Sequence, residues 1–223
     1  CRWVPAPAAV HSYALCCATQ DIAGANALLA PGGVVGTDGD GVREKDGLPL
    51  RMTYQTSTKA VRQDFQALTK QWWSESVVDV ELRNISASVF FGGDPGSPDT
   101  FQKFYADLEM YANTFNGTDP QSYLANLLCD KAPSPASQWQ GENISRFCSA
   151  EYDALHAQLA TTADAGERAP SARPLNEMAG SGGAMIPPVH RGRLSAHCNT
   201  LGGVVLIAWD RERWKCADWR GRK

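Results

Sequence analysis

The sequence predicts an α/β fold with a mixed sheet and flanking helices, and two observations indicate this class. Residues 48–57 and 76–85 alternate apolar and polar side chains, which is the period of a strand. Residues 58–76, which lie between these two segments, repeat apolar side chains with the period of one helix face. The repeating side chains are Val61, Phe65, Leu68 and Trp72. A strand, a helix and a strand in this order form a βαβ unit, with parallel strands and a right-handed crossover.

Composition limits the size of the protein and the nature of its partners. With 223 residues, the chain is long enough for one large domain or two small ones. A hydrophobic content of 43% suits a packed core and argues against global disorder. The net charge of −3 removes the electrostatic case for nucleic acid or an anionic membrane as the main partner. The chain has no run of 18 apolar residues, so we expect no transmembrane segment.

Before the βαβ unit, the pattern predicts an opening segment and one short helix. Residues 1–20 contain prolines and show no clear period. Residues 21–29 are expected to form a helix, because Asp21 is a favourable N-cap residue and apolar side chains follow on one face.

The stretch TDGDGVREKDG, residues 37–47, has two readings. Aligned with an EF-hand, it offers Asp38, Asp40 and Glu44 as oxygen ligands for calcium. However, glycines occupy the first and last ligand positions, so calcium binding is expected to be weak or absent. The other reading, which we favour, is a solvated turn in which Asp and Gly residues accommodate a tight backbone.

After the βαβ unit, the expected elements are shorter. We expect a helix over residues 99–107, a strand over 107–112 and helices over 120–129 and 149–161, the last capped by Ser149. Residues 164–183 have a helical outline that Pro170 and Pro174 are expected to break into short helices. An edge strand over 184–190 and a last apolar strand over 200–210 would complete the chain.

Cysteine usage points to an oxidising compartment. Seven cysteines are many for a reducing cytosol, and no CxxC pair is present. The four histidines are scattered, so a structural zinc site is not expected. Disulfide bonds explain the cysteines better than a zinc site does. Because the number of cysteines is odd, at least one thiol is free or paired with another chain.

Several segments together resemble the solute-binding proteins of bacterial peptide ABC transporters, the dipeptide- and oligopeptide-binding family. The resemblance starts with ANALL and the Asp-Gly-rich loop that leads into the first strand. The remaining matches, in the order of the family, are VRQDFQALTKQW, VDVELRNIS, DLEMYA with TDPQSYL, NISRFCSAEYDALHAQ, IPPVHR and AWDRERWKCADW. The resemblance covers roughly residues 21–220. Members of this family are commonly more than twice as long as this chain, so the resemblance is to a C-terminal fragment or a decayed relative.

The resemblance implies a fold and a function. The fold would be one lobe of a periplasmic-binding-protein type II-like fold. Residues 21–197 would form this α/β lobe, and residues 198–223 a strand region returning to the other lobe. The protein would capture a peptide or peptide-like solute for the permease of an ABC-type importer, and it would not be an enzyme. Its location would be periplasmic or extracellular, with a lipoprotein anchor on the full-length protein as an alternative.

The resemblance also implies where the solute lies. The strand and loop that face the cleft match YANTFNGTDP, so Asn113, Thr114, Phe115 and Asn116 are the expected contacts. In this family the main chain of the peptide is held much like an added strand. Some members have an aspartate near the position of Asn116, which binds the peptide's α-amino group. Asn116 offers a carbonyl oxygen without charge.

A disulfide between Cys129 and Cys148 is expected. These residues flank a long loop that is rich in Pro and Ser and contains little apolar surface. A bridge would connect the end of one helix to the start of the next, and some relatives carry a cysteine pair at these two places. Cys198 and Cys216 could form a second bridge, without support from the resemblance.

Two rival functions remain. The first is a secreted, disulfide-stapled α/β protein with a weak calcium loop and no transport role. The second is a hydrolase, because Ser195 lies between His190 and His197. The hydrolase is disfavoured because neither an orienting carboxylate nor a GxSxG motif accompanies these residues.

Overall fold

The computed structural model describes residues 20–36, 38–114, 119–181, 183–189, 195–207 and 213–221. Contacts between Cα atoms divide the chain into two compact units. The first, here called the sheet unit, comprises residues 17–113 and 130–147. The second, here called the helical unit, comprises residues 1–16, 114–129 and 148–223. These boundaries differ from those expected at residues 20 and 197, and the assignment of 21–197 to one lobe remains a prediction.

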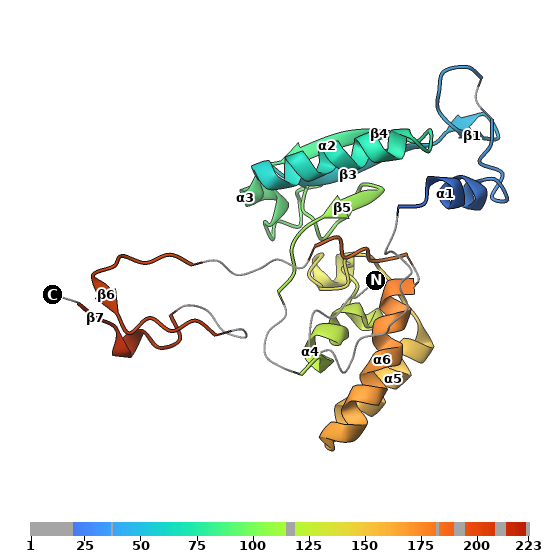
Figure 1. Ribbon diagram of the computed structural model, residues 1–223. Coiled ribbons are helices and arrows are strands. Elements are labelled where there is room, and N and C mark those ends of the chain that lie inside the picture. The colour runs from blue at the N-terminus through green and yellow to red at the C-terminus, as the bar shows by residue number, and fades with distance from the viewer. Residues whose placement is uncertain are drawn as a thin grey trace. The chain divides into compact units, whose positions relative to one another are not determined.

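The sheet unit contains the predicted βαβ unit. Strand β3 (Arg51–Ser57), helix α2 (Ala60–Ser74) and strand β4 (Asp79–Ile85) follow one another, and β3 and β4 pair in parallel. Strand β5 (Leu108–Met110) pairs in parallel with the other side of β3, which gives the order β4-β3-β5. Helix α2 lies lengthwise along β3 and β4 (Figure 1). The α/β class with flanking helices is therefore confirmed.

One face of this sheet forms the core of the unit. Tyr54, Val78 and Val80 are buried, and Trp73 of α2 packs against them. The predicted apolar stripe of α2 is wrong in part, because Val61, Leu68 and Trp72 are 63%, 45% and 41% exposed. The fully buried side chain of this helix is Gln66.

The burial of Gln66 is tolerated because both the nitrogen and the oxygen of its side-chain amide form hydrogen bonds. Its Nε2 donates to the carbonyl of Tyr54 at 2.7 Å, and its Oε1 accepts from Nδ2 of Asn84 at 2.6 Å. A polar residue can thus occupy a sheet-facing position that apolar periodicity would not select.

The remaining elements of the sheet unit are short. Helix α1 (Ile22–Leu29) starts as predicted, since the Asp21 carboxylate accepts a hydrogen bond from the backbone nitrogen of Gly24 at 2.7 Å. Strands β1 (Glu44–Lys45) and β2 (Leu48–Pro49) form an antiparallel ribbon, and helix α3 (Ala87–Phe90) follows β4. Two 3-10 turns, Cys129–Lys131 and Pro135–Ser137, lie in the loop that connects the helices of the other unit.

Residues 99–107 form turns, so the helix predicted there is wrong. Tertiary hydrogen bonds take the place of helical ones. The backbone nitrogen of Phe101 donates to the carbonyl of Phe90 at 2.8 Å, and that of Asp107 donates to the carbonyl of Thr53 at 3.1 Å. Lys103 donates to the carbonyl of Pro95 at 2.6 Å.

The helical unit packs four helical segments. They are α4 (Gln121–Leu124), a 3-10 turn (Ala125–Leu127), α5 (Ala150–Thr161) and α6 (Ala165–Ser181). The hydroxyl of Ser149 caps α5 as predicted, by accepting from the nitrogen of Tyr152 at 3.3 Å. The hydroxyl of Tyr152 in turn donates to the carbonyl of Leu124 at 2.8 Å. None of the described helices is long and apolar enough to cross a membrane.

Helix α6 is continuous although it contains Pro170 and Pro174, so the predicted break is wrong. Its buried stripe consists of Ala172, Leu175, Asn176 and Ala179. Helix α6 contacts α5 and lies beside it (Figure 1). Tertiary burial of one face offsets the unfavourable helix propensity of the two prolines.

The C-terminal segment of the helical unit has little strand. Residues 183–189 are irregular in the part described, which contradicts the predicted edge strand. The predicted strand over 200–210 is reduced to β6 (Leu201–Gly202), paired antiparallel with β7 (Arg220–Gly221). A 3-10 turn, Cys216–Asp218, precedes β7. The strand stops at Gly203, which has a left-handed φ of 86° and turns the chain.

Candidate functional site

The carboxyl ends of the three parallel strands define the place where a ligand is expected. In open α/β sheets, ligands bind outside these ends. Asn113 and Thr114 follow β5 closely and are exposed, as the predicted contact role requires. The boundary between the two compact units falls between them. The other two predicted contacts, Phe115 and Asn116, lie outside the described residues.

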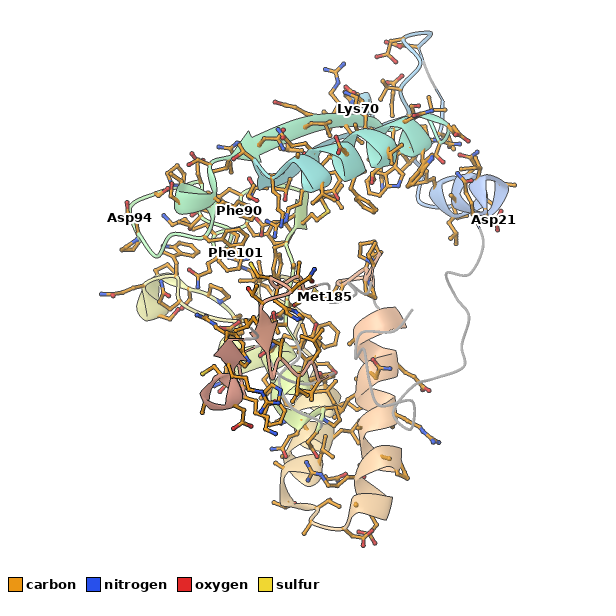
Figure 2. The ribbon with its side chains drawn as sticks, turned by 60° about the vertical axis from the view of Figure 1, so that its left-hand side comes forward. Asp21, Lys70, Phe90, Asp94, Phe101 and Met185 are labelled. Atoms are coloured by element: carbon orange, nitrogen blue, oxygen red, sulfur yellow. A yellow bond between two sulfur atoms is a disulfide. The ribbon has the colours of Figure 1, made fainter. Side chains whose placement is uncertain are left out.

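An aromatic cluster beside these strand ends was missed by the sequence analysis. Phe101 is the centre, with ring centroids 5.8 Å from Phe90, 5.4 Å from Phe91 and 5.3 Å from Tyr111. Figure 2 shows Phe90 and Phe101 close together. Tyr111 directly follows β5, and Phe91 follows α3. The run Phe90-Phe91 was the available signal, but its partners are distant in the sequence.

The guanidinium of Arg62 contacts this aromatic cluster. The guanidinium of Arg62, near the start of α2, lies 5.2 Å from the ring centroid of Phe91. Its Nη1 also donates to Oγ of Ser57, the last residue of β3, at 2.6 Å. Phe91 itself is 43% exposed. Aromatic faces beside a guanidinium suit an apolar or aromatic side chain with a nearby carboxylate or carbonyl.

The face of the sheet opposite to the apolar core of Tyr54 and Val80 carries a row of polar side chains. Gln55 of β3 is in register with Arg83 of β4 and with Glu109 of β5. Nε2 of Gln55 donates to Oε1 of Glu109 at 2.5 Å. Arg83 forms an ion pair with Asp99. Gln55 is 1% exposed, so this row is buried at its centre.

Glu109 has one oxygen without a partner. Its Oε2 is buried and accepts no hydrogen bond from the described residues. Burial raises the pKa of the Glu109 carboxyl to about 8, although the hydrogen bond from Gln55 and the charge of Arg146 act in the opposite direction. This carboxyl therefore holds a proton at neutral pH, and it lies on β5, the strand that leads into the candidate contact segment.

In the helical unit, the Asp-Pro motif is held by one arginine. Nε and Nη2 of Arg168 donate to the two oxygens of Asp119, each at 2.8 Å. Nη2 also donates to Oε1 of Gln121 at 2.8 Å, and Nη1 donates to the carbonyl of Leu159 at 2.9 Å. Hydrogen bonding to Arg168 lowers the pKa of Asp119 below its ordinary value. These contacts position the start of α4 rather than a ligand.

The carboxylates of the predicted calcium loop bind their own backbone. Glu44 accepts from the nitrogen of Asp38 at 2.9 Å, Asp38 from the nitrogen of Asp40 at 3.0 Å, and Asp40 from the nitrogen of Val42 at 2.8 Å. Within the described ranges, no group of three or more His, Cys, Asp or Glu side chains could hold a metal ion. The geometry is that of a turn in which Asp side chains bond nearby amides.

The predicted pair Cys129 and Cys148 forms a disulfide, with Cα atoms 4.7 Å apart. It joins the two points at which the helical unit's chain leaves and returns. Cys198 and Cys216 are free and exposed, so the second bridge considered from the sequence is absent. Cys1, Cys16 and Cys17 lie outside the described residues.

Ser195 and His197 line one hollow together with Arg213 and Trp219. His190 lies outside the described residues. Among the described side chains that line the hollow there is no carboxylate to orient a histidine.

Solved structures with a similar fold include two oligopeptide-binding proteins and NikZ. The oligopeptide-binding protein AppA from Bacillus subtilis, in complex with a nonapeptide, aligns with a TM-score of 0.66 and 17% identity, over 90% of this chain and 37% of that chain. NikZ from Campylobacter jejuni, in complex with Ni(L-His), aligns with a TM-score of 0.68 and 15% identity, over 90% of this chain and 39% of that chain. An oligopeptide-binding protein from Thermus thermophilus, complexed with a pentapeptide, aligns with a TM-score of 0.60 and 20% identity, over 71% of this chain and 27% of that chain.

These comparisons establish the fold. No protein-family model and no curated protein sequence matches the chain. The chain spans less than two fifths of the length of these solved structures. The chain therefore has the fold of part of a type II-like solute-binding protein, as the resemblance in the sequence predicted.

Proposed function

We propose that this chain is part of an extracytoplasmic solute-binding protein that captures a peptide-like solute for an ABC-type importer. The observation that carries the proposal is the structural similarity over 90% of the chain to a protein solved with a nonapeptide. The disulfide between Cys129 and Cys148 supports a location outside the cytoplasm, since disulfides persist in oxidising compartments. The permease of the importer would be the protein partner.

Within this proposal, the solute lies along residues 113–116 and against the aromatic cluster. Residues 111–114, which follow β5, have no regular secondary structure, and Asn113 is exposed, so the main chain of a peptide would lie beside this segment. The partly exposed ring of Phe91 would contact an apolar side chain of the solute, and Arg62 would favour a carbonyl or carboxylate nearby.

The expected affinity of this chain alone is low. A peptide clamped between two lobes owes its affinity to burial on both sides, and a single wall leaves it largely in water. We expect a Kd of about 1 mM or weaker, which corresponds to roughly −4 kcal/mol.

The test is a titration of the 223-residue chain with a pool of short peptides, followed by calorimetry and by amide and aromatic NMR shifts. The proposal predicts shifts at Asn113, Tyr111 and Phe91. Phe91→Ala should weaken them, and Val89→Ala should not, because Val89 is exposed on α3 outside the cluster. The absence of shifts at these residues up to ~10 mM peptide, well beyond the expected Kd, would contradict a peptide-binding role.

The alternative is a secreted, disulfide-stapled protein without a transport role. The disulfide supports this alternative as well. The peptide titration separates the two functions, because only the solute-binding protein should show shifts confined to the strand ends.

A further inference from the structure

The C-terminal segment of the helical unit contains a hollow that the proposed function does not use. Its volume is about 260 Å³, and it is lined by Ser195, Ala196, His197, Val204, Arg213 and Trp219. This volume is below the usual range of about 300–1,000 Å³ for drug-sized ligands, so it suits a small molecule or a terminal group.

The walls of this hollow are held together by backbone pairing. Strands β6 and β7 pair in antiparallel register at Leu201 and Gly221. A Cβ atom on Gly203 would come within 2.3 Å of the carbonyl oxygen of Asp218. Because only glycine permits this approach, Val204 and Trp219 are brought to the same place.

The indole of Trp219 supplies a hydrogen-bond donor that is not used. Its Nε1 atom is buried and has no acceptor among the described residues. An indole nitrogen can only donate, so the missing partner has to be an acceptor. A buried donor without a partner costs roughly 1–3 kcal/mol, which a bound acceptor would recover.

The charge in the hollow also favours an anion. Arg213 is a lining residue, and its guanidinium offers donors but no acceptor. Within the part of the chain that the structure describes, no carboxylate pairs with Arg213. Asp218, which precedes Trp219, is engaged by Lys215 at 3.0 Å. His197, which also lines the hollow, adds a ring nitrogen that can donate.

We propose that this hollow is a binding site for a small oxyanion, a carboxylate or a phosphate group, held by the Arg213 guanidinium and the Trp219 indole. A guanidinium binds either group through two parallel hydrogen bonds. The indole would donate a third to the same anion.

The experiment uses the full chain, labelled with ¹⁵N, and follows the indole N–H signals of the tryptophans. Sodium acetate and sodium phosphate are added in separate titrations, with sodium chloride at matched ionic strength as the third. Trp219→Phe and Trp214→Phe assign the two signals. Trp214 is the internal control, because its Nε1 already donates to the carbonyl of Val205 at 3.0 Å.

The Trp219 signal should move saturably with acetate or phosphate, while the Trp214 signal stays. The anion that saturates at lower concentration identifies the carboxylate or the phosphate class. Arg213→Gln should weaken binding by about tenfold or more, as expected for a lost charge-assisted pair. Arg220→Gln should have no effect, because Arg220 is exposed and does not line the hollow.

Three results would overturn the proposal: no saturable movement with either anion, an equal movement with chloride, or unchanged binding in Arg213→Gln. The dispersion of the remaining signals shows whether each variant is folded. Arg213→Lys provides a second variant, which keeps the charge and should bind more weakly than the unmodified chain but more tightly than Arg213→Gln.

Discussion

The helical unit and the sheet unit each contain a carboxyl group with a shifted pKa, and the two shifts have opposite directions. In the helical unit, Arg168 finds acceptors in both oxygens of Asp119, in the side chain of Gln121 and in backbone carbonyls. In the sheet unit, Glu109 has a hydrogen bond at one oxygen and no described partner at the other. Hydrogen bonding lowers the pKa of Asp119, and burial raises the pKa of Glu109.

The difference shows that burial and hydrogen-bond partners together decide whether a carboxyl group is charged, because Asp119 is half exposed and bonded at both oxygens, whereas Glu109 is mostly buried. A carboxylate bonded at both oxygens by a guanidinium is stable as an ion. A buried carboxyl group with one oxygen that accepts no hydrogen bond, such as that of Glu109, is more stable with its proton. The following experiments test this contrast, from the largest expected effect to the smallest.

The largest effect is expected from the pH dependence due to Glu109. With a folded pKa of about 8 and an ordinary value of 4.5, the folded state binds more protons than the unfolded state between these pH values. The free energy of unfolding should therefore decrease as pH rises from 4.5 to 8, by up to about 4 to 5 kcal/mol. Urea unfolding from pH 4 to 9 measures this decrease.

The variant Glu109→Gln should lose this pH dependence. Glu81→Gln, at an exposed position on the neighbouring strand β4, is the matched control and should keep it. Parallel pH profiles for Glu109→Gln and the unmodified chain would show that Glu109 is ionised normally.

The disulfide should contribute the next largest effect. Replacing both Cys129 and Cys148 by Ser opens a closed loop with a sequence separation of 19. The chain-entropy model puts the loss at roughly 3 kcal/mol. The double replacement of the free, exposed Cys198 and Cys216 by Ser is the control and should leave the unfolding midpoint unchanged. Equal midpoints for the two double variants would contradict a stabilising role.

Loss of the arginine network should have a smaller effect. Arg168→Met keeps the length of the side chain and removes the guanidinium donors to Asp119, Gln121 and the carbonyl of Leu159, while the backbone nitrogen of Gln121 still donates to Asp119. We expect a loss of about 2 kcal/mol, because several charge-assisted hydrogen bonds are removed at a side chain that is 20% exposed. Chemical unfolding followed by far-UV circular dichroism is the measurement.

The control for Arg168 is Arg51, whose ion pair with Asp79 is exposed at 63% and 40%. Arg51→Met should cost less than about 1 kcal/mol, since exposed ion pairs contribute little. Similar losses for both variants would mean that the Arg168 network adds nothing beyond a surface pair.

The smallest effect is expected from calcium. Because Asp38, Asp40 and Glu44 already accept hydrogen bonds from their own loop, binding should have a Kd of about 1 mM or weaker. The melting temperature should not change between a chelator and micromolar calcium. A clear drop on chelation would establish a metal site in this loop.

Local chemistry determined much of the fold from the sequence. The βαβ unit, the helix capped by Asp21 and the helix capped by Ser149 were all predictable. Their signals lie within a few residues, because side-chain periods and N-caps act over one or two turns. The position of Cys129 and Cys148 at the two ends of a loop with little apolar content, together with the family resemblance, predicted their disulfide.

Tertiary structure decided the rest, because the deciding partners are far away in the sequence. Residues 99–107 are turns since the backbone nitrogens of Phe101 and Asp107 donate to the carbonyls of Phe90 and Thr53 instead of to carbonyls four residues earlier. Helix α6 continues through two prolines because one of its faces is buried and the helix packs against α5. The proton on Glu109 and the aromatic cluster at Phe101 exist only once strands that are far apart in the chain have paired. Periodicity along the chain records which face is apolar, and it does not record which group will stand opposite a polar side chain when that face is covered.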